Sequence, residues 1–264
     1  MKNHQTVEGR RPRVEGRHKD AAAYSRPQLS TLNSQLAFTL IELLVVISII
    51  GVLAGFSFPV LKAVKKTQYL NHTKAELALI ETAIQRYHDA YGFYPPGNPN
   101  YPAVPSDAMF SPLYFELLGT TNNNHVYQTL DGSAQINDNT LPAPNVTGGF
   151  GVGGFINCSK VGSSEDAPAA KNFLPGLKPK QFGINIINQF NFPNVPVALL
   201  LGSVGGPDQN YQPLGVVDEN PWRYVSPGVN NPNSYDLWIQ LVISGKTNLI
   251  CNWSKQVQVN SPLP

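Results

Sequence analysis

The sequence lacks the residue patterns that the common catalytic and metal sites require. Its two cysteines, Cys158 and Cys251, form no CxxC motif, and its five histidines form neither an HxxxH nor an HExxH pattern. No GxSxG occurs. The glycine-rich stretch Gly148–Gly154 lacks a following Lys-Ser/Thr, so it is interpreted as a flexible surface loop rather than a phosphate loop. We therefore expect a protein that is not an enzyme and carries no catalytic cofactor.

Charged residues are also scarce, at 14% of the 264 residues, with a formal net charge of +2. From Gly92 onward the chain holds ten acidic residues against seven basic ones. A weakly acidic C-terminal part argues against a nucleic-acid-binding face, so no nucleic acid is expected among the partners. The length is sufficient for one membrane helix and one soluble domain of ordinary size.

What the chain does have is a long uncharged apolar run from Leu43 to Leu61. As a helix, this run would extend roughly 28 Å, which approaches the thickness of a bilayer core of about 30 Å. One carboxylate, Glu42, stands at the beginning of the run. A carboxylate at full depth in a membrane costs roughly 2–3 kcal/mol, so an acid at this position indicates a function.

The sequence around Glu42 resembles a known processing signal. Ala37-Phe38-Thr39-Leu40-Ile41-Glu42, followed by the apolar run, is similar to the prepilin peptidase signal of type IV pilins and type II secretion pseudopilins. That family has Gly followed by Phe-Thr-Leu-Ile-Glu, so that five of six positions match and Ala37 replaces the glycine. Pro59 also stands where pilin helices carry a proline. The resemblance implies cleavage between Ala37 and Phe38 and N-methylation of Phe38.

Two other interpretations of the apolar run remain open. It could be an ordinary signal anchor in which Glu42 is incidental, or a secretory signal peptide cleaved after Val52-Leu53-Ala54. The first residue of the mature protein distinguishes the three, because it would be Phe38 for a prepilin, Gly55 for a signal peptide, and unchanged for an anchor.

The apolar run divides the chain into four segments. Residues 1–37 are polar and basic without periodicity, which predicts a disordered leader that the resemblance implies is cleaved. Residues 38–61 are expected to span the membrane and later form a filament core. Residues 62–91 are expected to continue the same helix as an amphipathic half, and residues 92–264 to form a globular α/β head.

The second half of the helix is predicted from its apolar spacing. The residues of the stripe recur at three, four and seven positions and are Ala63, Leu70, Leu77, Ile80, Ile84, Tyr87 and Tyr91. Most charged residues, including Glu76, are expected to lie off this stripe. Phe38–Tyr91 would be one helix of roughly 80 Å, kinked or locally opened at Pro59, with Gly92 as its C-cap.

The head is expected to combine one short helix, Ser111–Leu118, with strands near the C-terminus. The predicted strands are Val195–Leu201, Leu237–Ile243, Asn248–Trp253 and the edge strand Gln256–Val259, with a two-residue hairpin turn at Gly245. A long helix followed by a small antiparallel sheet is an α+β fold, and it is also the pilin-like fold.

Two further stretches resemble the secretion pseudopilins. Tyr91–Pro95 is similar to the Gly-x-Tyr-Pro that follows their long helix, and Asn220–Gly228 with Ser234–Trp238 is similar to the C-terminal region of the major pseudopilin. In that region the family holds calcium with aspartates and backbone carbonyls. Asp236 is therefore a weak calcium candidate, since no acidic residue follows it and calcium takes six to eight oxygens. The alternative is an aspartate that caps or flanks a strand.

The resemblance also implies a location. Four lysines follow the apolar run, at Lys62, Lys65, Lys66 and Lys74. The positive-inside rule alone would place them in the cytoplasm. The cleavage motif implies the opposite orientation, a single-pass inner-membrane protein with a periplasmic C-terminal head that later enters a periplasmic filament. In that compartment Cys158 and Cys251 could form a disulfide, and two free thiols are equally consistent with the sequence.

The function implied by the resemblance is structural. Prepilin peptidase would process the chain, which would assemble with other pseudopilins, through an inner-membrane assembly platform, into a helical pseudopilus for type II protein secretion. Glu42 would pair with the amino terminus of Phe38 in a neighbouring subunit. Two alternatives stay open: a type IV pilin of a surface fibre for adhesion or motility, and a membrane-anchored binding protein that does not polymerise.

Overall fold

The computed structural model describes residues 38–99, 107–140, 149–160, 169–189 and 192–260. The leader, residues 1–37, lies outside these ranges, and with it Ala37. The chain divides into two compact units, Met1–Leu53 and Ala54–Pro264, and each is described by itself.

Helix α1 comprises Leu40–Tyr91, 52 residues, and belongs to both units. It begins two residues later than predicted and continues through Pro59 as one helix. It ends at the predicted residue because Gly92 adopts a φ of +80° and donates its amide to His88 O at 2.7 Å. A glycine accepts this left-handed conformation without the Cβ penalty of other residues.

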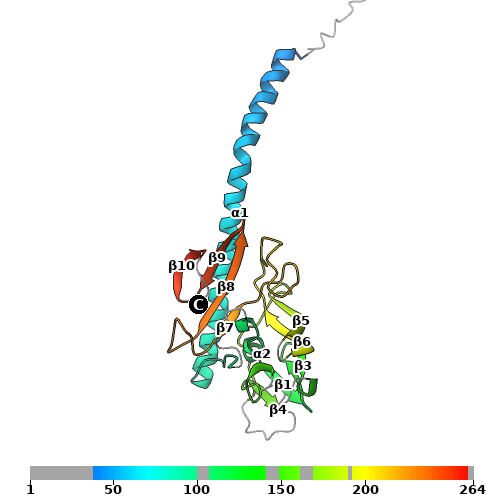
Figure 1. Ribbon diagram of the computed structural model, residues 1–264, viewed down its shortest axis with the longest axis vertical. Coiled ribbons are helices and arrows are strands. Elements are labelled where there is room, and N and C mark those ends of the chain that lie inside the picture. The colour runs from blue at the N-terminus through cyan, green and yellow to red at the C-terminus, as the bar shows by residue number, and fades with distance from the viewer. Residues whose placement is uncertain (1–37, 100–106, 141–148, 161–168, 190–191, 261–264) are drawn as a thin grey trace, which may run out of the picture. The chain divides into compact units, whose positions relative to one another are not determined.

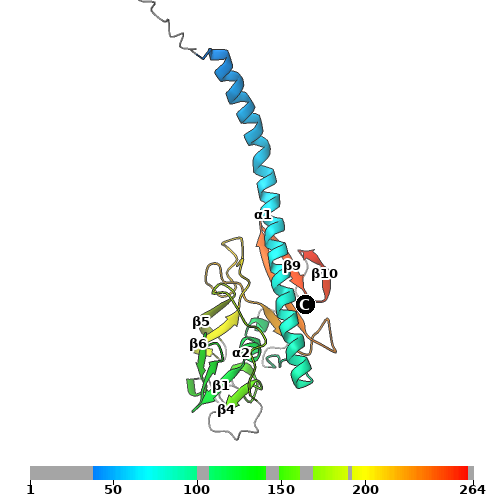
Figure 2. The same ribbon diagram turned by 180° about the vertical axis from the view of Figure 1, so that it is seen from behind.

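The C-terminal half of α1 packs on the second unit through the predicted stripe. Leu77, Ile80, Ile84 and Tyr87 are all buried in the main hydrophobic core together with residues of the C-terminal sheet. Both ribbon views show this half of the helix beside strands β8 and β9 (Figures 1 and 2). Ala63, at the start of the predicted stripe, is exposed.

The prediction that the charged residues of this helix lie off the apolar stripe is wrong for Glu76. This residue is 5% exposed, and its two carboxylate oxygens accept the Ser203 amide at 3.3 and 3.1 Å. Gln181 Nε2 donates to the same carboxylate at 3.2 Å. A buried carboxylate needs such donors to replace water, so Glu76 fixes a loop of the head against α1.

The C-terminal sheet is antiparallel in the order β10-β9-β8-β7. Its strands are β7 Arg223–Val225, β8 Asp236–Ile243, β9 Lys246–Cys251 and β10 Ser254–Val259. Ser244 and Gly245 connect β8 to β9 with φ angles of +53° and +72°. Two consecutive positive φ angles are typical of the primed turns that match the twist of a hairpin, so the predicted turn is confirmed.

The middle of the chain is more regular than its composition predicted. Helix α2, Leu113–Leu118, confirms the predicted short helix, and within the described residues two more sheets accompany it. One has the order β3-β2-β1-β4, and its strands are β1 Thr120–Asn123, β2 Val126–Thr129, β3 Gln135–Asn137 and β4 Cys158–Lys160. The other sheet is the hairpin of β5 Phe182–Gln189 and β6 Phe192–Leu200. Short 3-10 helices also occur, at Asp107–Met109 and Asp138–Thr140. A long helix with mostly antiparallel sheets confirms the α+β, pilin-like fold.

The glycine-rich stretch departs from the surface loop that was predicted. Phe150 is fully buried in the core, and Gly151 has a φ of +70°. A Cβ at Gly151 would lie 2.6 Å from Pro99 Cδ. The described part of this stretch, residues 149–154, is thus packed against the core through Phe150, while Gly148 lies outside the described residues.

A fully buried carboxylate, Glu116 of α2, joins α1 to the chain before β4. It accepts the amides of Ile156 and Asn157 at 2.8 and 3.0 Å, and the hydroxyl of Tyr87 at 3.1 Å. Burial raises the pKa of Glu116, and these three hydrogen bonds partly oppose the shift.

Asn157 extends the same network with its side chain. Its Nδ2 donates to Glu116 O at 2.7 Å and to Lys171 O at 2.6 Å. Its Oδ1 accepts the Tyr91 hydroxyl and the Lys171 amide, both at 2.8 Å. One fully buried amide therefore satisfies four groups from three separate segments.

Asn157→Ala should lower the free energy of unfolding of the head by about 3 kcal/mol, because each buried group left without a partner costs about 1–3 kcal/mol. Chemical denaturation of the full chain in mild detergent measures this. Asn233→Ala removes an exposed asparagine and should change the value by less than about 0.5 kcal/mol. Equal stability of the two variants would contradict the role given to Asn157.

Candidate functional site

The first unit presents an apolar surface with no cover. All residues from Phe38 to Phe56 are exposed. Helix α1 is long and apolar enough to cross a membrane by length and composition. A contiguous apolar surface of this kind marks a site that contacts lipid or other protein.

Glu42 lies in the first turn of α1, at the polar end of this surface. Its Oε2 accepts the Thr39 amide at 2.8 Å and the Thr39 hydroxyl at 2.7 Å. In return, Thr39 Oγ1 accepts the Glu42 amide at 3.3 Å. This reciprocal arrangement is a capping box, in which each of the two side chains accepts a hydrogen bond from the backbone N–H of the other residue. These N–H groups would otherwise lack a partner at the start of the helix.

The capping role of Glu42 was not predicted, although its signal, Thr-x-x-Glu before an apolar run, is present in the sequence. The cap holds the carboxylate at the N-terminus of the helix, where the helix dipole favours negative charge. Phe38, 82% exposed, directly precedes Thr39. A carboxylate has about four acceptor sites, so the cap leaves capacity for a further donor.

Asp236, the calcium candidate, organises a loop of the head instead. Its buried carboxylate accepts the backbone amides of Val229, Asn230 and Asn231 at 2.8, 2.7 and 3.0 Å. Asn230 Nδ2 donates to it at 3.0 Å. Gly228 is required beside it, because a Cβ there would lie 2.6 Å from Asp236 Oδ1.

This donor set does not fit a calcium ion. Calcium needs six to eight oxygen ligands, and both oxygens of Asp236 face N–H groups. Among the described residues no group of three or more His, Cys, Asp or Glu could hold a metal. The alternative interpretation of Asp236, as an aspartate at the start of a strand, agrees with its position at the first residue of β8.

Asp236→Asn should lower the free energy of unfolding by about 3 kcal/mol, since the new amide would oppose N–H donors that now bind a charged acceptor. Thermal unfolding of the full chain should show a midpoint lower by roughly 10 °C. Calcium or a chelator should leave the wild-type midpoint unchanged. The matched control, Asp218→Asn, alters an exposed residue with a φ of +62° that asparagine tolerates, so no shift is expected. A midpoint raised by calcium would contradict this assignment.

The two cysteines are free thiols in the structure. Cys158 begins β4, and Cys251 ends β9, which belongs to a different sheet. The possible disulfide between them is therefore not formed here.

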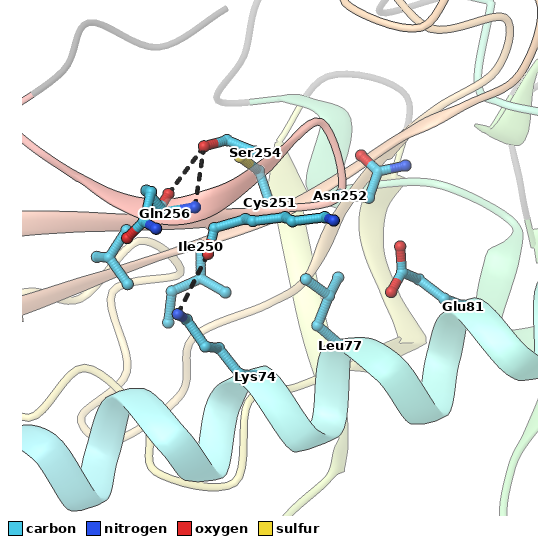
Figure 3. A pocket seen from close by; sticks show the side chains of 10 residues that line it. Lys74, Leu77, Glu81, Ile250, Cys251, Asn252, Ser254 and Gln256 are labelled. Atoms are coloured by element: carbon cyan, nitrogen blue, oxygen red, sulfur yellow. Dashed lines mark hydrogen bonds between the residues drawn. The ribbon is translucent and has the colours of Figure 1, made fainter.

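A cavity of about 380 Å³ lies between α1 and the hairpin of β9 and β10. Lys74, Leu77 and Glu81 face it from the helix, and Lys74 Nζ donates to Lys255 O at 3.3 Å (Figure 3). One thiol, that of Cys251, lines the cavity, and no histidine does. Burial raises the pKa of this thiol, which keeps it protonated. The lining thus supplies no activated nucleophile.

Comparison with known proteins points to one family. Residues 32–58 match the family described as the prokaryotic N-terminal methylation motif. The chain is 30% identical over 115 residues to the fimbrial protein EcpB of Eikenella corrodens, an alignment that covers 44% of this chain and 69% of that protein. No solved structure matches at a comparable significance.

The motif coincides with the capped start of α1 and the exposed apolar surface that follows it. The similarity to the fimbrial protein covers 115 residues, many more than the motif itself. The chain therefore belongs to the type IV pilin-like proteins, which carry a prepilin-type N-terminal cleavage and methylation signal, and it is a pilin-type structural subunit.

Proposed function

We propose that the chain is a pseudopilin of a type II secretion system. Prepilin peptidase removes residues 1–37 by cleavage between Ala37 and Phe38 and methylates the new amino group. Residues 38–61 first anchor the subunit in the inner membrane and then form the filament core. Residues 62–91 connect them to the periplasmic head, residues 92–264.

The observation that carries this proposal is the position of the Glu42 carboxylate, fixed by Thr39 at the first turn of an uncovered apolar helix. Cleavage before Phe38 creates an ammonium group close to this turn. When the helix leaves the bilayer for a filament core, that ammonium loses water, and Glu42 of a neighbouring subunit supplies the counter-charge. An unpaired buried charge costs several kcal/mol, so the pair sets the register between subunits as well as the energy of assembly.

The rest of the apolar surface supports close helix contacts. The space beside Gly51 and Gly55 is empty, since a Cβ added to either glycine would have no other atom within 4 Å. A neighbouring helix could therefore approach the backbone there. When one surface of a subunit binds a different surface of the next subunit, each added copy leaves a free surface for another. If the subunits do not close into a ring, such contacts generate an open helical polymer. The inner-membrane assembly platform of the secretion system would insert each new copy.

Two candidate functions remain, and separate observations favour them. The resemblance of Tyr91–Pro95 and Asn220–Trp238 to secretion pseudopilins favours a periplasmic filament for protein secretion. The fimbrial relative favours a type IV pilin of a surface fibre. Deletion of the gene separates them, because the first predicts loss of secreted proteins and the second predicts loss of surface fibres.

Glu42→Gln should reduce filament assembly by at least about ten-fold, because glutamine preserves the capping box but removes the counter-charge. Thr39→Ala is the matched control, since it removes the cap and leaves the charge, and it should reduce assembly much less than Glu42→Gln does. Sheared filament fractions measure assembly, and membrane fractions check that each variant still inserts. Normal filaments from Glu42→Gln would contradict the proposed charge pair.

The mature N-terminus provides an independent check. Mass spectrometry of the N-terminal peptide from membranes should identify Phe38 as the first residue, carrying one added methyl group. Ala37→Gly, which restores the residue usual in the family, should be cleaved at least as completely. A peptide that begins at Gly55, or an uncut chain, would contradict the prepilin pathway.

A further inference from the structure

A cluster of three lysines follows the apolar run on its C-terminal side. Lys62, Lys65, Lys66 and Tyr69, here called the basic patch, are spaced at three, four and seven positions and so share one face of α1. Lys62 and Lys65 are exposed, while Lys66 and Tyr69 are half-buried. Within the described part of the chain no acidic side chain forms an ion pair with these lysines.

The basic patch is one wall of a cavity that is open to solvent. The cavity has a volume of about 310 Å³, and its other wall consists of Pro207, Asp208, Ile243 and Ser244. Asp208 is the one acid in this lining, and its Oδ2 accepts the Gly245 amide at 3.1 Å. Three lysines against one carboxylate leave the lining with an excess of positive charge, beside the apolar surfaces of Pro207, Ile243 and Tyr69.

The position of the basic patch matches the headgroup layer of a membrane. The uncharged run ends at Leu61, and Lys62 to Lys66 extend roughly 6 Å further along the helix. The headgroup layer on each side of a bilayer is roughly 5–8 Å thick.

The charge of the basic patch opposes the usual distribution around a membrane helix. Lysines concentrate on the cytoplasmic side of such helices, whereas the proposed orientation places these three on the periplasmic side. A cluster at this position requires a local interaction that favours cations. Anionic phospholipid headgroups supply one, since each lysine near an anionic bilayer surface strengthens binding about five-fold.

We propose that the basic patch binds the phosphate headgroup of an anionic phospholipid, such as phosphatidylglycerol, in the periplasmic leaflet. The proposal rests on the membrane-anchored orientation of the proposed function but not on polymerisation. The lysines contact the phosphate, and the apolar surfaces of the cavity contact the glycerol part of the lipid. This combination of charged and apolar contacts fits an amphipathic lipid better than free phosphate. Binding of the lipid holds the subunit at a defined depth in the membrane before assembly.

The test uses the full chain reconstituted in vesicles of phosphatidylglycerol and phosphatidylcholine, extracted into mild detergent and analysed by native mass spectrometry. Because the basic leader also attracts anionic lipid, the comparison is between variants that share it. Lys62→Gln/Lys65→Gln/Lys66→Gln should retain at least roughly ten-fold less phosphatidylglycerol than wild type, because three factors of about five are reduced by salt screening, with phosphatidylcholine unchanged. The control, Lys171→Gln/Lys178→Gln/Lys180→Gln, removes the same charge from exposed positions of the head and should behave as wild type. The arginine triple variant of the basic patch should also behave as wild type.

Several outcomes would overturn the proposal. Equal retention by the two glutamine variants would show that net charge alone attracts the lipid. Displacement of phosphatidylglycerol by an equal concentration of inorganic phosphate would show that the patch recognises phosphate alone and not the lipid. Normal lipid retention with lost filaments in the patch variant would make the patch a contact between subunits. Flotation with vesicles of phosphatidylcholine alone tests the anchor separately, and a wild-type chain that does not float would overturn the anchored state and this proposal with it.

Discussion

The central constraint on this molecule is that the apolar surface of residues 38–56, most of it on α1, is unfavourable in contact with water. All of these residues are exposed in the single chain. The run Leu43–Leu61 contains thirteen Leu, Ile, Val and Phe residues, which favour the bilayer by roughly 5 kcal/mol at about 0.4 kcal/mol each. One carboxylate at the edge of the run costs less than the 2–3 kcal/mol of a central one, so insertion with Glu42 in place is favourable. Lipid and neighbouring helices are therefore the two environments in which this segment is stable.

The head uses its buried carboxylates to hold loops, and this explains how a chain with so many irregular segments keeps one structure. Glu76, Glu116 and Asp236 each accept backbone amides from a segment distant in sequence or from a tight loop. A carboxylate satisfied by backbone donors replaces the ladder hydrogen bonds that an irregular loop lacks. The same arrangement explains why Asp236 does not fit the metal role that the family resemblance suggested, since its oxygens are already used by N–H groups.

Much of the fold could be predicted because it depends on local patterns. The apolar stripe predicted Leu77, Ile80, Ile84 and Tyr87 in the core, and two strand-like segments on either side of a glycine turn predicted the hairpin of β8 and β9. The strands β1 to β4 were not predicted, because segments such as Thr120–Asn123 are polar and lack apolar alternation. Strand β1 pairs with β2 across Asn124 and His125, whose φ angles are positive, and it also pairs with β4, which is distant in sequence. The burial of Glu76 and Phe150 has the same cause, since their partners, Ser203 and the core, are supplied by the tertiary fold.

The candidate site was predictable in its residues but not in its geometry. The motif identified Glu42 as the important acid, while its hydrogen bonds to Thr39 show that the carboxylate is already oriented in the single subunit. This matters for assembly, because a counter-charge fixed by the helix cap loses less side-chain freedom when it binds an ammonium than a mobile glutamate would. Conversely, the lysines after Leu61 carry the opposite charge at the other end of the apolar run. Under the two proposals above, a copy that enters a filament gains a charge pair at the glutamate end and gives up lipid contacts at the lysine end, and one helix carries both changes.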